Sequence, residues 1–111
     1  MSLKPVGQFA ALKRFLGGYY YQTVWEDFSS DEEVWIAYAK CADLQTMRRL
    51  VEQIGTLLKQ PPETIDHVLA DAIGVAGGLD FENPQEASVW LNRLRTYMLS
   101  VLSQNESLQS G

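Results

Sequence analysis

Catalytic chemistry in this chain would have to centre on His67, the single histidine. On a helix, Glu63 and Asp71 would stand four residues before and after it, where carboxylates can pair with an imidazole. Nucleophilic catalysis also needs a base held beside a serine or cysteine, and the sequence pattern pairs no nucleophile with His67. We interpret the spacing as a solvated helical face. An enzyme would require a pocket around His67 with convergent acids, and we predict no catalytic residue.

Metal and phosphate sites have no support in the sequence either. A zinc site takes about four Cys, His or carboxylate ligands, whereas Cys41 and His67 are single and far apart. The glycine-containing run at 74–78 lacks the lysine and the preceding strand of a phosphate-binding loop. We therefore predict no metal, no cofactor and no small-molecule substrate.

The notable chemistry is the grouping of acidic residues. One base-free segment interleaves its acids with Trp25 and Phe28, and a second extends from Glu63 to Glu86. The acids are Glu26, Asp27, Asp31, Glu32 and Glu33 in the first segment, and Glu63, Asp66, Asp71, Asp80, Glu82 and Glu86 in the second. Two interpretations stay open: acids that stabilise helix N-termini and solvate the surface, or an acidic surface with aromatic anchors for a basic partner.

Composition narrows the class of partner and the location. A net charge of −5 and a pI near 4.7 argue against nucleic-acid binding, which needs clustered Lys and Arg. The N-terminus lacks the apolar run of a signal peptide, and no stretch approaches the roughly 20 apolar residues of a membrane span. The single Cys41, expected at the core or its boundary, suits a reducing compartment. We expect a cytoplasmic protein that contacts neither membrane nor nucleic acid.

The elements that position these residues are helical. Apolar stripes predict about five helices: one over 8–22, one capped by Ser30 and Glu33, one after Asp43, one from Pro61-Pro62, and one after Asn83-Pro84. Trp25 falls in an expected loop, as does the segment 74–82. Tyr19 and Trp90 are assigned to the core. The fold class is all-α: a compact single-domain bundle spanning 1–111, with its core at about 8–102 and a polar tail at 103–111 that we expect to fray.

Three blocks of sequence resemble a known family. They are Phe15-Leu16-Gly17-Gly18-Tyr19-Tyr20-Tyr21-Gln22, Ser30-Asp31-Glu32-Glu33, and Ala87-Ser88-Val89-Trp90-Leu91-Asn92-Arg93-Leu94. Together with the long leucine-rich helix between them, they resemble the CdiI-type immunity proteins of contact-dependent growth inhibition systems over roughly residues 9–102. The family pattern usually has an Asp after the Gln and then an aromatic residue; here Thr23 and Val24 stand in those places, followed by Trp25.

The resemblance implies a cytoplasmic protein that binds and neutralises the C-terminal toxin domain of a CdiA-type secreted protein. Such toxins are often nucleases, whose basic surface would complement this acidic chain. On this hypothesis, the contact candidates are Tyr21, Trp25, Glu26, Asp27, Asp31 and Glu32, followed by Asp80, Phe81 and Glu82. The alternative is a small acidic helical adaptor or regulator unrelated to toxin immunity.

Overall fold

The computed structural model describes residues 9–74 and 77–110, with side chains described as far as Asn105. Over these residues the chain is all-α, as predicted, and contains no strand. Its helices are α1 (Ala10–Tyr19), α2 (Val24–Asp27), α3 (Asp31–Cys41), α4 (Leu44–Leu57), α5 (Pro62–Ile73) and α6 (Pro84–Ser110).

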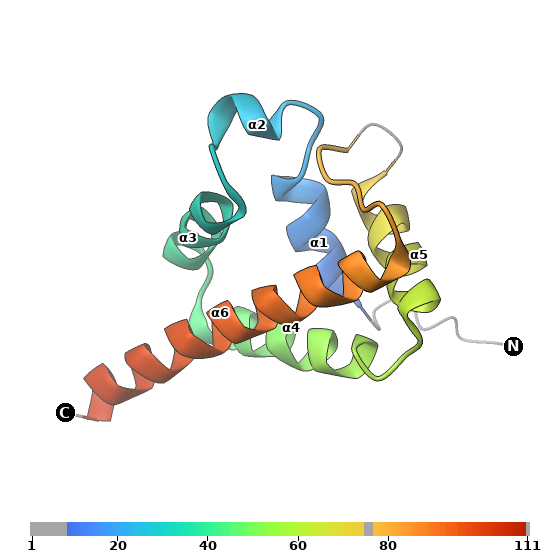
Figure 1. Ribbon diagram of the computed structural model, residues 1–111. Helices are drawn as coiled ribbons and strands as arrows, with labels where there is room; N and C mark the ends of the chain where they lie inside the picture. The colour runs from blue at the N-terminus through green and yellow to red at the C-terminus, as the bar shows by residue number, and fades with distance from the viewer. Residues whose placement is uncertain (1–8, 75–76, 111) are drawn as a thin grey trace, which may run out of the picture.

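The helix α1 lies between α5 and α3 and packs on α4, while α6 runs along the bundle and packs on α5, α4 and α3 (Figure 1). Its stripe of Leu12, Phe15 and Leu16 is almost fully buried, as helical spacing requires of a central helix. Trp90 of α6 is buried, which confirms its assignment to the core, while Tyr19 is half-buried against that core. The short α2 and the loop before α6 lie together at one end of the molecule.

The N-terminus of α3 is fixed by the predicted cap, with one difference. The hydroxyl of Ser30 accepts a hydrogen bond from the backbone N–H of Glu33 at 3.3 Å. The Glu33 carboxylate, however, accepts from the backbone N–H of Ser29 at 2.9 Å and from its hydroxyl at 2.7 Å, rather than from Ser30. These bonds lower the pKa of Glu33. The cap therefore also fixes the chain that enters α3 from α2.

The other predicted caps are present. Asp43 accepts from the backbone N–H of Thr46 at 2.7 Å at the start of α4. Asn83 accepts from the backbone N–H of Glu86 at 2.9 Å at the start of α6, and Glu86 returns to the backbone N–H of Glu82 at 3.0 Å. The loop before α6 and the chain before α3 are thus held by the same device, a glutamate in the first helical turn that reaches back.

Four boundary or burial predictions need correction. The first helix ends at Tyr19 and not near residue 22, while its predicted start at Gln8 lies outside the described residues. Trp25 stands in the four-residue α2 rather than in a loop. Cys41 is exposed rather than at the core or its boundary; it is the last residue of α3, and the chain leaves the helix at the extended Ala42. The helix α6 continues to Ser110, through the polar segment that was expected to fray.

Candidate partner-binding surface

The first acidic segment and the last part of the second meet at the end of the molecule formed by α2 and the loop 77–83, whereas Glu63, Asp66 and Asp71 lie on α5. The indole N–H of Trp25 donates to the backbone carbonyl of Gly78 at 2.6 Å, and the backbone N–H of Gly78 donates to the carbonyl of Tyr20 at 3.1 Å. This approach requires glycine, because a Cβ at Gly78 would lie 2.6 Å from the carbonyl oxygen of Tyr21. Segments more than fifty residues apart in the chain therefore lie side by side at one end of the bundle (Figure 1).

We call this surface the acidic end. It comprises the nine predicted contact residues, which the structure brings to the same end of the bundle around α2, the N-terminus of α3 and the loop before α6. They are Tyr21, Trp25, Glu26, Asp27, Asp31, Glu32, Asp80, Phe81 and Glu82.

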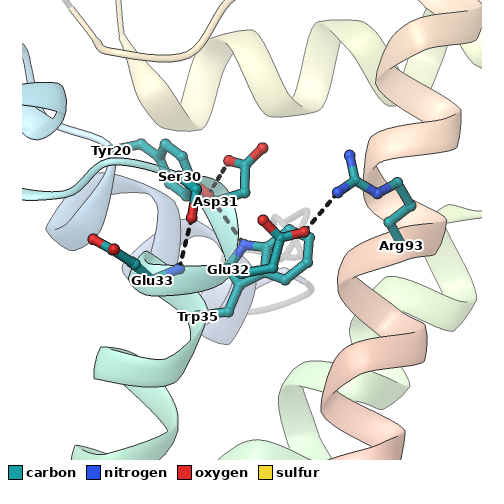
Figure 2. Close-up of polar contacts among 7 residues, drawn as sticks. All are labelled: Tyr20, Ser30, Asp31, Glu32, Glu33, Trp35 and Arg93. Carbon is teal, nitrogen blue, oxygen red and sulfur yellow. Dashed lines mark hydrogen bonds and ion pairs between the residues drawn. The ribbon is translucent and has the colours of Figure 1, made fainter.

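Tyr20 is the buried centre behind the acidic end. Its hydroxyl donates to Asp31 Oδ1 at 2.6 Å and accepts from the indole N–H of Trp35 at 3.1 Å (Figure 2). Burial, followed by the hydrogen bond to Asp31, raises the pKa of Tyr20 well above its ordinary value of 10.0. The phenol is therefore a permanent donor at neutral pH, and it fixes one oxygen of Asp31 in place.

Glu32 belongs to an ion pair that sequence reasoning missed. A guanidinium nitrogen of Arg93 on α6 lies 2.8 Å from a Glu32 carboxylate oxygen, and both side chains are 52% exposed (Figure 2). The same guanidinium lies over the ring of Trp35, 5.7 Å from its centroid. An ion pair this exposed contributes only about 0–1 kcal/mol to stability. Its larger effect is to neutralise one of the predicted contact acids.

The α2 side of the acidic end remains open to solvent. Trp25 is 45% exposed, although its N–H is bonded and its ring packs edge-on against Tyr20 at a centroid distance of 6.1 Å. Tyr21 donates its hydroxyl to Asp27, and this hydrogen bond raises the pKa of Tyr21. Glu26 is exposed beside them. This region presents two aromatic rings, Tyr21 and Trp25, beside two acids. The ring of Trp25 is held in place by its contacts with Gly78 and Tyr20.

A groove of about 470 Å³ opens next to this region, between the loop before α6, the N-terminus of α3 and the first turns of α6. Asp31, Asp80 and Phe81 line it, so it joins both predicted segments. Val89 and Arg93 also line it, and neither was predicted. The sequence does hold one signal for Val89. It is apolar but lies next to the buried Trp90, outside the buried stripe of α6, which indicates an exposed apolar side chain.

The described residues show neither a metal-binding cluster nor a membrane-spanning helix. Among the side chains described, those of 9–74 and 77–105, no group of three or more from His, Cys, Asp and Glu is arranged to hold a metal ion. No helix in this part of the chain combines the length and apolar character needed to cross a membrane. His67 is exposed on α5 and lines none of the pockets described along these residues.

Fold and surface define the class: a small all-α domain that presents acidic side chains and aromatic rings on one open end. A family model described as CdiI immunity protein matches residues 8–98, and the chain therefore belongs to the CdiI immunity protein family. Immunity proteins of this family are generally not enzymes. Neither the comparison with curated proteins nor the comparison with solved structures gave a match.

Proposed function

We propose that this protein binds and neutralises the C-terminal toxin domain of a CdiA-type secreted protein, in the cytoplasm of the cell that makes both. The observation that carries the proposal is the family match, which spans residues 8–98 of a 111-residue chain. The acidic end supports it, because an inhibitor of a nucleic-acid-cleaving toxin would need to complement a basic surface.

On this proposal the toxin is a nuclease, and the acidic end covers the basic surface that would otherwise hold phosphates. Glu26, Asp27 and Glu82 are exposed and supply long-range attraction to a basic partner. Trp25 supplies a rigid apolar contact at the centre of these charges, since its indole is already fixed by the bond to Gly78. Aromatic side chains are enriched in the buried centres of protein interfaces, whereas polar and charged groups lie at the rim.

The test is growth rescue followed by a direct assay. The C-terminal domain encoded immediately upstream of this gene is expressed from an inducible promoter, with this protein or with an empty vector. We expect arrest with the empty vector and restored growth with the protein. The purified toxin domain should then degrade RNA or DNA, and an equimolar amount of this protein should stop the cleavage.

Two other outcomes are informative. Toxicity that this protein does not relieve would overturn the immunity proposal and favour the adaptor alternative. Rescue of growth with a toxin domain that cleaves neither RNA nor DNA would keep immunity but reject the nuclease assignment.

A further inference from the structure

The groove beside α6 has apolar walls and an acidic rim. Leu79, Phe81, Val89 and Trp90 form apolar lining, and Val89 is 61% exposed. It is the most exposed of the large apolar side chains in the described part of the chain, ahead of Trp25 at 45%. An apolar residue this exposed contributes little to the fold, and Val89 does not stand alone. With Leu79, Phe81 and Trp90 it forms a continuous apolar lining bordered by polar side chains, which is the composition of a contact surface.

The acids of the groove are held in place before any partner arrives. Asp31 Oδ1 accepts from the Tyr20 hydroxyl, Asp80 Oδ1 accepts from the backbone N–H of Phe81 at 3.0 Å, and Glu86 Oε1 accepts from the backbone N–H of Glu82. Each carboxylate thus uses one oxygen to fix its orientation. Preorganisation of this kind reduces the entropy lost on binding.

The groove carries an excess of negative charge. Asp31, Asp80 and Glu86 face one base, Arg93, whose guanidinium is engaged by Glu32 and by the ring of Trp35. The N-termini of α3 and α6 offset part of this charge, about half an elementary charge for each helix. A net attraction for cations remains, over walls that favour aliphatic and aromatic contacts.

We propose that this groove receives an arginine side chain from the basic surface of the toxin domain, so the inference rests on the proposed function. The aliphatic stem packs on Val89, the planar guanidinium stacks on Phe81, and its N–H groups reach the carboxylates of Asp80 and Glu86. Arginine fits this combination because its stem is apolar and its head pairs with carboxylates and stacks on rings.

The first test places a guanidinium group of the protein itself in the groove, where it competes with the arginine of the toxin domain. Val89→Arg adds a guanidinium at an exposed helical position, and Leu99→Arg makes a matched change ten residues further along α6, at a side chain that is 39% exposed and outside the groove. Binding to the purified toxin domain is measured by calorimetry. We expect Val89→Arg to weaken binding by about 30-fold or more, on the scale of a central contact, and Leu99→Arg to stay within about twofold of the parent protein.

The second test removes charge without removing the internal acceptors. Glu86→Gln keeps an oxygen for the Glu82 N–H, and Glu63→Gln is the control on α5. We expect about tenfold weaker binding for Glu86→Gln and no change for Glu63→Gln. Circular dichroism checks that all four variants remain helical.

The outcomes separate the two proposals. If the parent protein binds the toxin domain but Val89→Arg and Glu86→Gln bind as tightly as their controls, the groove is not the contact and immunity stands. If the parent protein neither binds nor protects, the proposed function fails and the groove inference fails with it.

Discussion

Removing one hydroxyl from Tyr20 should destabilise the whole acidic end. The substitution Tyr20→Phe keeps the ring in the core, where it is fully buried, and deletes the atom that joins Asp31 to Trp35. The indole N–H of Trp35, a side chain only 2% exposed, then loses its acceptor. Asp31 is partly exposed and can turn to water instead. The larger part of the loss therefore comes from the buried indole.

The expected loss follows from the two bonds. A hydrogen bond to a carboxylate contributes about 1.5–3 kcal/mol, and a neutral one about 0.5–1.5 kcal/mol, with a further penalty for leaving a buried donor unpaired. Partial rehydration of Asp31 recovers some of the free energy lost with its hydrogen bond. We expect a decrease of about 2–4 kcal/mol in the free energy of unfolding, measured by urea titration with circular dichroism.

The neighbouring residue supplies the control. Tyr21→Phe also deletes a hydroxyl bonded to an aspartate, but that hydrogen bond is at the surface. We expect its unfolding midpoint to stay close to that of the parent protein. Equal midpoints for Tyr20→Phe and Tyr21→Phe would refute the reasoning, because they would mean that the buried network contributes no more than an exposed bond.

Three further predictions follow from the same region and its surroundings. Gly78→Ala should lower the melting temperature, because its Cβ would lie 2.6 Å from a backbone carbonyl oxygen. Gly18→Ala in α1, with open space around it, should instead stabilise the protein by about 0.5–1 kcal/mol. Equal changes in melting temperature for the two variants would contradict the close approach of the chain at Gly78. Replacing Glu26 and Asp27 together by lysine should slow association with the toxin domain at least tenfold at low salt and much less at 1 M salt, where screening acts over about 3 Å; a salt-independent effect would exclude steering. The pKa of Glu33 is lower in the folded protein than its ordinary value of 4.5, so Glu33 stabilises the fold above pH 4.5, and this stabilisation is lost as the pH falls through the lower folded value. Glu33→Gln should therefore reduce the fall in the free energy of unfolding at acid pH, and an unchanged fall would reject this assignment.

The sequence predicts local structure well because helix ends depend on near neighbours. Ser30, Asp43 and Asn83 each accept from a backbone N–H three residues on, as their spacing indicates. The end of α1 at Tyr19 was less predictable, because the aromatic stripe continues the helical period through Tyr20. There, tertiary bonds from the Tyr20 hydroxyl and carbonyl decide the conformation.

The composition of the acidic end was predictable only in part. All nine residues lie at one end, but the contacts that organise them join residues 53 and 61 apart, namely Trp25 with Gly78 and Glu32 with Arg93. Local spacing holds no information on such pairs, since they depend on how α2 packs against the loop before α6 and on how α3 packs against α6. The exposure of Val89 could be inferred from its place outside the buried stripe of α6, but only the packing of α6 shows that it faces a groove.

The two interpretations of the acids, helix stabilisation and partner binding, describe different residues of one surface. Asp31 and Glu86 are bound at helix N-termini, where the helix dipole offsets part of their charge and hydrogen bonds fix their orientation. Glu26 and Glu82 are exposed outside the long helices and attract a partner from a distance. Acids with a fixed orientation stabilise the complex once it has formed, whereas freely exposed acids speed the first encounter with the partner. Neutralising Glu86 should therefore raise the dissociation rate, and neutralising Glu26 should lower the association rate. If both substitutions changed the same rate constant, the acidic end and the groove beside it would be acting as one undifferentiated charge.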